Sequence, residues 1–311
     1  MNLRSSTVTI VLLLLCSTCL GQAQRGSSQP LESGEYFITQ SWSQETNFKR
    51  PYFVRVPKGR APNEKLPVFI FLHGNGGRAE GAMNGSMRRL SNIAQRYIMV
   101  FPDGYERSWN IVSERSKADD KAFMEEIVKQ LATYPNVQTD NFSIMGNSNG
   151  AALVNQLAIE SKLPNIKNYI SAVSPLNGFQ YDGKNFKIRG KNNEYKKIAE
   201  PMPGKRLLNI SGTEDPLVPY SGGPSRAIPA KGGKLPFVAA ENSTYLWAKQ
   251  MGYKGKQLSS PTHRIGPLEV FSYLNGAVVH VKVNRQGHGA GGAVRPETLL
   301  DFLDGRELFN R

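Results

Sequence analysis

The segment Gly146-Asn147-Ser148-Asn149-Gly150 sets a serine between two glycines, after an apolar run at 142–145 and before a helical pattern at 149–159. A serine hydroxyl is a poor nucleophile until a tight strand-to-helix turn holds it away from its own backbone and a base takes its proton. The turn crowds the backbone, so small residues are needed two positions before and after the serine. We therefore predict that Ser148 is a nucleophile and that the N–H of Asn149, at the helix start, donates to an oxyanion.

The chain has four histidines, and one of them is well placed to act as a base. His288 follows the last strand pattern within Gly-His-Gly, where the glycines let a loop bring the ring over the serine. His73 opens a glycine-rich loop, and we expect it to hold the shape of that loop. His263 lies in a polar connection, and His280 lies inside a strand pattern, where a structural role is expected.

An acid that would orient this base follows the strand pattern at 206–212, in Gly212-Thr-Glu-Asp-Pro. Asp215 is the predicted acid, because it lies just past the carboxyl end of that strand, and Glu214 is the alternative. Active groups in doubly wound sheets lie at the carboxyl ends of strands. The resulting order along the chain, serine, then aspartate, then histidine, is the order of the α/β-hydrolase triad.

A second glycine-rich loop, His73-Gly-Asn-Gly-Gly77, follows a continuously apolar run at 67–72. Glycines at the end of a central strand let backbone N–H groups approach a ligand closely. We predict that Gly74 or Asn75 donates the second N–H of an oxyanion hole. The loop lacks the lysine and hydroxyl positions of a phosphate-binding loop.

Short apolar strands alternate with amphipathic helices, which predicts a doubly wound, mostly parallel α/β sheet. The alternating runs at 35–39 and 50–56 predict an antiparallel N-terminal edge, and Asn275-Gly276 predicts a type I′ turn in a hairpin over 268–283. The other expected strands are 98–103, 142–145 and 169–175, and the expected helices are 87–97, 119–134, 149–159, 241–251 and 296–309.

Two long segments have no clear period. Residues 177–204 are polar and basic, and we interpret them as a small lid or substrate wall, with a solvated loop that makes no substrate contact as the alternative. Residues 220–236 are expected to form a second long loop.

Residues 1–23 have the features of a secretory signal peptide: Arg4, an apolar run at 8–16, and a small-x-small site at Gly21-Gln-Ala23. An uncleaved anchor is the alternative, although the run is short for a membrane span. The prediction is a secreted, extracellular protein with a single catalytic domain over 24–311 and no membrane contact. Both cysteines lie within 1–23, so the mature chain is expected to have no thiol, disulfide or Cys-ligated metal site. Hydrolysis through a serine needs no metal or cofactor, and none is expected.

The chain has 39 Lys+Arg and 25 Asp+Glu, a net charge of +14 that becomes +13 (38 − 25) without Arg4. This excess favours acidic partners such as an acidic polysaccharide or matrix component, with a solvated surface that binds no partner as the alternative. Nucleic acid is not expected, because no nucleic-acid-binding motif is present. The sequons at Asn84 and Asn242 are predicted glycan sites, Asn209 is expected to be buried in a strand, and Asn141 is a doubtful site.

From about Pro67 to Leu303 the sequence resembles the secreted esterases that include polyhydroxybutyrate depolymerases and feruloyl and acetyl xylan esterases. The resemblance implies triad roles for Ser148, Asp215 and His288, oxyanion N–H groups from Asn149 and the 73–76 loop, and a substrate wall near Trp109. The matching motifs are Leu72-His-Gly-Asn-Gly, Ser108-Trp-Asn with Asp119-Asp120 and Phe123, Gly146-Asn-Ser-Asn-Gly-Ala, Gly212-Thr-Glu-Asp-Pro-Leu-Val-Pro-Tyr with Gly222-Gly223, the Trp247 helix and Gly287-His288.

The chain departs from this family in two places: Asn75 replaces a frequent cysteine, and Gly-Ala-Gly follows His288 where relatives often have Trp-Pro. The predicted function is a secreted serine esterase that cleaves carboxylic esters of polyester, feruloyl or acetyl-polysaccharide type. One alternative is a catalytically idle, basic matrix protein on the same scaffold. Another is a serine peptidase of prolyl-cleaving type, since Gly-Thr-x-Asp-x-x-Val-Pro also occurs in those enzymes, although this chain has no propeller domain.

Overall fold

The computed structural model describes residues 28–61 and 64–309. The predicted signal peptide at 1–23, with both cysteines, lies outside this range. Within the range, no helix combines the length and the apolar character that crossing a membrane would need.

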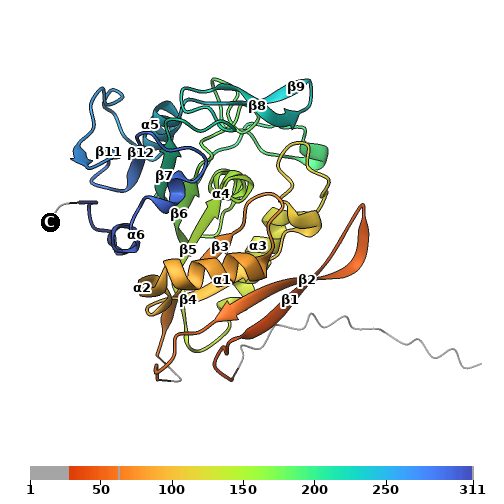
Figure 1. Cartoon of the computed structure of the whole chain (residues 1–311). Coiled ribbons are helices and arrows are strands. Elements are labelled where there is room, and N and C mark those ends of the chain that lie inside the picture. Colours follow the sequence, from red (N-terminus) through yellow and green to blue (C-terminus); the bar gives the residue numbers. More distant parts are fainter. Residues whose placement is uncertain (1–27, 62–63, 310–311) are drawn as a thin grey trace, which may run out of the picture.

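The main sheet of the described residues has ten strands in the order β1-β2-β4-β3-β5-β6-β7-β12-β11-β10 (Figure 1). Its centre, from β4 to β12, is parallel, and antiparallel strands flank it on both sides. This confirms the predicted doubly wound, mostly parallel sheet with an antiparallel N-terminal edge. The strands are β1 (Gly34–Trp42), β2 (Glu45–Arg55), β3 (Leu66–Leu72), β4 (Ile98–Pro102), β5 (Val137–Asn147), β6 (Ile166–Ala172), β7 (Arg206–Gly212), β10 (His263–Ile265), β11 (Leu268–Tyr273) and β12 (Val278–Val283).

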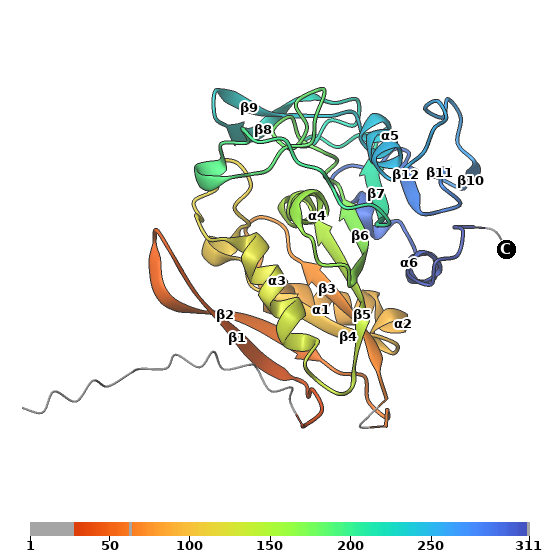
Figure 2. The same ribbon diagram turned by 180° about the vertical axis from the view of Figure 1, so that it is seen from behind.

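Helices cover both faces of the sheet, as the two views in Figures 1 and 2 show. One apolar core joins the sheet to α3, α4 and α5, and a second joins the opposite face to α1, α2 and α6. Strand β4 is buried along its whole length, whereas the edge strand β1 alternates between half-buried and exposed residues. The helices are α1 (Ala79–Arg89), α2 (Ser91–Ala94), α3 (Asp120–Leu131), α4 (Asn149–Glu160), α5 (Ala240–Gln250) and α6 (Pro296–Leu303).

Three expected elements differ from the structure. The helix expected at 87–97 begins at Ala79 and breaks at Leu90 into α1 and α2; two glycines in α1 hid its start. The expected loop at 220–236 contains a hairpin, β8 (Gly223–Ala230) and β9 (Gly233–Phe237). The closing helix α6 ends at Leu303 rather than 309. The Asn275-Gly276 turn is confirmed: both residues have positive φ, 52° and 80°.

Residues 177–204 and the hairpin β8–β9 together form a layer that we call the cap. The amide N–H of Gly178 donates to the Pro236 carbonyl at 2.8 Å and so joins the two parts. In Figures 1 and 2 the hairpin lies above α4, at the top of both views.

The cap packs tightly against α4 and α5. Gln180 Nε2 donates to the Ala152 carbonyl at 2.8 Å, and the Phe186 ring lies 4.5 Å from the Trp247 ring. Every residue of α4 from Gly150 to Ile159 is buried, because the sheet covers one side of the helix and the cap covers the other. The 177–204 segment is therefore a packed layer. Its charged residues are exposed except Lys187 and Arg189, whose side chains are 13% and 14% exposed.

Candidate active site

The predicted nucleophile lies on a strained turn between β5 and α4. Ser148 has φ 55° and ψ −118°, a conformation that costs energy for any residue with a side chain. A Cβ at Gly146 would lie 2.3 Å from the Gly150 carbonyl carbon, and a Cβ at Gly150 would lie 2.5 Å from the His73 carbonyl oxygen. Neither position has room for a side chain, which is the physical reason for the two glycines around the serine.

The structure brings Ser148, His288 and Asp215 together from three loops at the carboxyl ends of strands. Ser148 Oγ lies 2.8 Å from His288 Nε2, and His288 Nδ1 lies 2.7 Å from Asp215 Oδ2. In the neutral ring that these contacts fit, Nδ1–H donates to Asp215 and Nε2 accepts the serine proton. The Asp215 side chain is 2% exposed and the His288 side chain 23% exposed, so the acid is sealed while the base stays accessible.

Asp215 is held as a carboxylate. Burial opposes its ionisation, but hydrogen bonds from His288 and from the Val218 and Leu217 amides outweigh burial and lower the pKa of Asp215. Both amides donate to Oδ1, at 3.0 and 2.9 Å, which leaves Oδ2 for His288. The alternative acid, Glu214, is exposed and forms no hydrogen bond or ion pair with His288 in the described part of the chain.

Two backbone loops could supply oxyanion donors. The Asn149 amide is the first N–H of α4 and has no backbone acceptor within the described residues. The 73–77 loop lies beside the nucleophile, since a Cβ at Gly74 would lie 3.5 Å from Ser148 Cβ. The amides of Gly74 and Asn75 likewise donate to no acceptor in that part of the chain, so both remain candidates for the second donor.

The carbonyls of this loop are fixed by hydrogen bonds. His73 Nδ1 donates to the Gly74 carbonyl at 2.8 Å, and Nε2 accepts the Gly104 amide at 3.0 Å. Since the C=O and N–H of a trans peptide point in opposite directions, holding the Gly74 carbonyl also directs the Asn75 N–H. The expectation that His73 holds the loop agrees with these contacts.

The predicted role of Trp109 is wrong. It was expected to form a substrate wall, but its side chain is fully buried and cannot contact a substrate. Its Nε1 donates to the His73 carbonyl at 2.8 Å, and its ring lies 4.9 Å from the His73 ring. The His73 carbonyl belongs to the peptide that carries the Gly74 N–H. Trp109 is therefore a positioning residue for the oxyanion loop.

The side chain of Asn149 fastens the Trp109 loop to the nucleophile turn. Its Oδ1 accepts the Trp109 amide at 2.7 Å, and its Nδ2 donates to the Trp109 carbonyl at 3.0 Å and to Glu114 Oε1 at 3.1 Å. Glu114 Oε2 in turn accepts the amides of Ile111 and Val112 at 2.9 and 2.7 Å. No sequence pattern marks Glu114, because its role depends on a loop conformation that no local pattern encodes.

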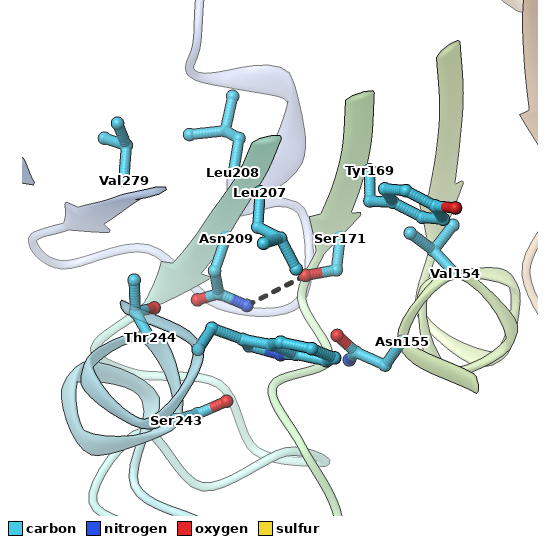
Figure 3. A pocket seen from close by; sticks show the side chains of 11 residues that line it. Val154, Asn155, Tyr169, Ser171, Leu207, Leu208, Asn209, Ser243, Thr244 and Val279 are labelled. Carbon is cyan, nitrogen blue, oxygen red and sulfur yellow. Dashed lines mark hydrogen bonds between the residues drawn. The ribbon is translucent and has the colours of Figure 1, made fainter. Parts of the chain in front are cut away.

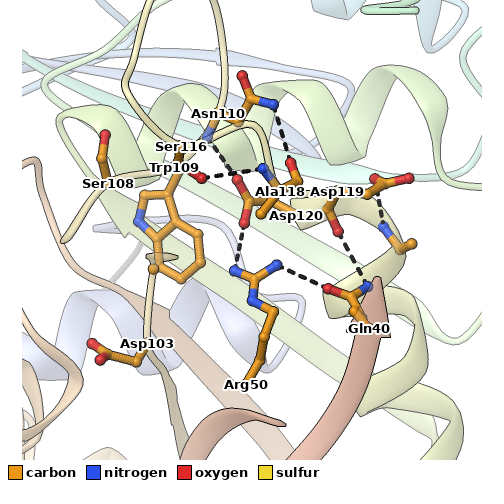
Figure 4. A network of polar contacts seen from close by, with 12 residues as sticks. Gln40, Arg50, Asp103, Ser108, Trp109, Asn110, Ser116, Ala118, Asp119 and Asp120 are labelled. Atoms are coloured by element: carbon orange, nitrogen blue, oxygen red, sulfur yellow. Dashed lines mark hydrogen bonds and ion pairs between the residues drawn. The ribbon is translucent and has the colours of Figure 1, made fainter. Parts of the chain in front are cut away.

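A buried ion pair anchors the same loop from the other side (Figure 4). Arg50 Nη2 lies 2.6 Å from Asp120 Oδ1, and both side chains are 1% exposed. Asp120 Oδ2 accepts the Asn110 amide at 2.6 Å, and the Arg50 guanidinium stacks 3.8 Å over the Phe123 ring. The pair thus joins β2, the Trp109 loop and the start of α3, where Asp119 caps the helix by accepting the Ala122 amide.

The remaining histidines lie apart from Ser148. His280 is fully buried in β12, where it contacts Asn209 Oδ1 at 2.9 Å and the Tyr220 hydroxyl at 2.8 Å. Burial lowers the pKa of His280 to about 3, so this ring stays neutral. His263 is half-buried in the short edge strand β10. Across the described ranges, no group of three or more His, Cys, Asp or Glu side chains could hold a metal ion.

The four sequons differ in exposure. Asn209 is 7% exposed and donates to Ser171 Oγ at 3.2 Å, as Figure 3 shows, so the prediction that it is buried is confirmed. The enclosed cavity beside it, about 10 Å3, has room for about one water and none for a substrate. Asn84 is exposed in the middle of α1, Asn242 is half-buried in the first turn of α5, and Asn141 is half-buried in β5.

Comparisons with known proteins find a thioesterase family model and esterases. A family model for palmitoyl protein thioesterase matches residues 67–207, which include Ser148 and end before the acid and the base. Feruloyl esterase B of Piromyces equi is 27% identical over 211 residues, a match that covers 67% of this chain and 36% of that protein. The chain thus spans about a third of the length of this relative.

Solved structures share the fold. Acetyl xylan esterase from Aspergillus awamori matches with a TM-score of 0.60 at 12% identity, covering 87% of this chain and 99% of that one. A thermostable esterase matches with a TM-score of 0.54 at 14% identity, covering 88% of this chain and 63% of that one. At such identities the likeness establishes the fold, and the chemistry has to be argued from the site itself.

Proposed function

We propose that this chain, an α/β-hydrolase that resembles feruloyl and acetyl xylan esterases, hydrolyses carboxylic esters through an acyl-enzyme on Ser148. The observation that carries the proposal is the continuous contact from Ser148 Oγ to His288 Nε2, at 2.8 Å, and from His288 Nδ1 to Asp215, at 2.7 Å. Ser148 lies on a strained turn at the start of α4, a position that presents a nucleophile and stabilises an oxyanion.

The reaction follows from the placement of these groups. His288 Nε2 takes the hydroxyl proton as Ser148 Oγ attacks the ester carbonyl, and Asp215 stabilises the imidazolium that forms. The carbonyl oxygen gains a negative charge, which the amides of Asn149 and of Gly74 or Asn75 stabilise. His288 then protonates the leaving alcohol, and the acyl-enzyme remains. Water, activated by the same histidine, attacks the acyl-enzyme and releases the acid.

The test is a panel of esters offered to the wild type and to Ser148→Ala. The panel contains p-nitrophenyl acetate and butyrate, methyl ferulate, acetylated xylan, a polyester and a dipeptide amide. Hydrolysis of esters that disappears in Ser148→Ala supports the proposal. Equal rates in both proteins would contradict it, and cleavage of the amide alone would favour the prolyl-peptidase alternative.

The substrate class within this proposal is an ester of feruloyl, acetyl-polysaccharide or polyester type, and the cap supports a polymeric acidic substrate. Lys187, Arg189 and Lys196 of the cap have carboxylate partners. The other basic side chains of the cap are exposed and form no ion pair in the part of the chain that the structure describes: Lys184, Lys191, Lys197, Arg226, Lys231 and Lys234. Among the described residues the cap has one exposed carboxylate without an ion pair, Glu200, so its unpaired charge is mostly positive and favours a polyanion.

Binding of Ser148→Ala protein to an acidic polysaccharide such as heparin or alginate checks this part of the proposal. We expect retention that weakens as salt rises and that falls when Lys191, Lys197 and Lys231 are replaced by Gln. Retention without salt dependence would contradict the role of the cap. Strong retention together with no ester hydrolysis by the parent protein would favour the matrix-protein alternative.

Export completes the proposal: the protein is secreted after cleavage behind Ala23 and carries glycans at Asn84 and Asn242. The apolar run and the small-x-small site support the first statement, and the exposure of Asn84 supports the second. N-terminal sequencing of protein from the culture medium should begin at Gln24. A chain that stays inside the cell with residues 1–23 attached would contradict secretion.

A further inference from the structure

An open pocket of about 310 Å3 lies next to the nucleophile. Gly74 of the oxyanion loop and Asn147, the residue before Ser148, line its inner end. The turn that follows His288 forms a second wall with Gly291 and Gly292. No residue of the cap lines this pocket, so it lies open to a group on an ester that is bound at Ser148.

The charge of this pocket is positive. Arg78 and Arg89, at opposite ends of α1, line it, and no acidic side chain does. Neither arginine forms an ion pair within the ranges 28–61 and 64–309. The charge of Arg78 contributes to the lowered pKa of the nearby Asp103 carboxylate. Asp103 Oδ1 is already occupied by a hydrogen bond from the Ala79 amide, at 2.8 Å.

The two arginines differ in how they are held. Arg89 Nη1 donates to the Gly291 carbonyl at 3.0 Å, so it fixes the wall behind His288, and burial lowers the pKa of its guanidinium. Arginine remains charged under all working conditions. The guanidinium of Arg78 has no hydrogen-bond partner among the described residues and is exposed at the rim. Arg78 is therefore free to bind a ligand, and Arg89 adds charge from a fixed position.

The backbone after His288 keeps the pocket open. In the four residues Gly289-Ala-Gly-Gly292, the only side chain is the methyl group of Ala290. No atom lies within 4 Å of where a Cβ of Gly292 would be. Guanidinium groups bind carboxylates in a planar, two-pronged geometry. Space beside the nucleophile, two guanidinium groups and no acidic lining together fit a substrate that carries a carboxylate near the scissile bond.

We infer that this pocket binds a carboxylate on the ester substrate, so that the enzyme prefers anionic esters over neutral esters of the same size. This inference rests on the proposed esterase function and names the substrate class of the same site. The carboxylate can belong to the acyl part or to the alcohol part of the ester. Two matched pairs of esters separate these sources.

The first pair, mono-p-nitrophenyl adipate and p-nitrophenyl hexanoate, places the charge on the acyl side. The second pair, 4-acetoxybenzoate and its methyl ester, places the charge on the alcohol side. In the wild type we expect kcat/KM for the anionic member to exceed that for the neutral member about 10-fold in at least one pair at low salt. The ratio should fall as salt rises, because ions screen exposed charges.

Arg78→Gln should reduce this ratio about 5-fold or more. Arg88→Gln is the matched control: it removes an arginine charge from the last turn of α1, whereas Arg78 precedes the first turn, and Arg88 does not line the pocket. Its Nε donates to the Asn84 carbonyl of α1. We expect Arg88→Gln to leave the ratio unchanged. No preference for the anion in either pair, or an equal change of the ratio in both variants, overturns the inference.

Calorimetric binding to Ser148→Ala separates this inference from the proposed function. The uncleaved adipate ester should bind more tightly than the hexanoate ester, and Arg78→Gln should abolish the difference. Selective binding by a wild type that cleaves no ester would refute the proposed function and leave the pocket standing. Ester cleavage without selective binding would refute the pocket alone.

Discussion

Replacing Trp109 by Phe tests how the oxyanion loop is held. The substitution keeps a buried aromatic ring and removes the hydrogen bond from Nε1 to the His73 carbonyl, 2.8 Å long. That carbonyl belongs to the same planar peptide as the Gly74 N–H, so releasing one end frees the other to rotate. The variant changes the orientation of a donor without touching Ser148, His288 or Asp215.

The expected magnitudes follow from this one bond. A buried acceptor that loses its partner costs about 1–3 kcal/mol, so we expect the free energy of unfolding to fall by about 1–2 kcal/mol. A full oxyanion donor contributes about 2.7–4 kcal/mol to the transition state. If the donor is loosened rather than removed, we expect about half of this transition-state stabilisation to be lost, which lowers kcat about 10- to 30-fold. KM should change little, because the donor acts mainly on the charged transition state.

The assay is steady-state hydrolysis of p-nitrophenyl acetate beside urea unfolding of each protein. Trp247→Phe is the matched control: Trp247 is 3% exposed, and its Nε1 has no hydrogen-bond partner among the described residues. It should lose comparable packing and keep kcat within about 2-fold, since a single change away from the donors leaves the transition state intact. A Trp109→Phe protein that is destabilised but keeps its kcat would refute the positioning role.

Three further predictions concern charges. Asp120→Asn leaves Arg50 buried without a counter-charge and should lower the unfolding free energy by about 3–5 kcal/mol. Asp119→Asn should lower it by less than about 1 kcal/mol, because Asn caps a helix nearly as well as Asp. Urea unfolding of both variants measures these changes. Burial lowers the pKa of Lys205 to about 8, so between pH 7 and 9.5 this side chain binds more protons in the unfolded chain than in the folded one. The unfolding free energy of the wild type, measured relative to Lys205→Met, should therefore rise by about 2 kcal/mol over this range. A difference that does not change with pH would show that the ammonium keeps its ordinary pKa. Because the pKa of Asp215 is lowered in the folded protein, its charge stabilises the fold at pH values above the ordinary pKa of an aspartate, and this contribution is lost as the pH falls through the lowered pKa. The difference in unfolding free energy between the wild type and Asp215→Asn should therefore shrink below about pH 4. A difference that grew below this pH would contradict the assignment.

The sequence predicted the parts of the site that depend on local patterns. Glycines at fixed offsets around Ser148 mark a crowded turn, and His288 and Asp215 each follow a strand pattern directly. In a parallel sheet these strand ends meet at one edge, so order along the chain was enough to predict that the three residues lie near one another.

The sequence could not predict the parts that depend on packing. An exposed and a buried tryptophan have the same local pattern, so the role of Trp109 needed the fold. Glu114 acts through three backbone and side-chain partners that only the folded loop brings together. Glycine and proline in β8 and β9 hid a hairpin that packs against Val218, next to the acid loop. Helix α1 begins at Ala79 because its apolar side packs on the sheet, despite two glycines of low helix propensity.

The central claim is that Ser148 becomes acylated with His288 as its base. Reacting the protein with a p-nitrophenyl alkylphosphonate and mapping the adduct by peptide mass spectrometry tests it directly. We predict one adduct, on Ser148, and a rate of labelling at least about 100-fold lower in His288→Gln, within the range that general bases contribute. Labelling at another residue, or labelling of Ser148 at the same rate without His288, would contradict the account.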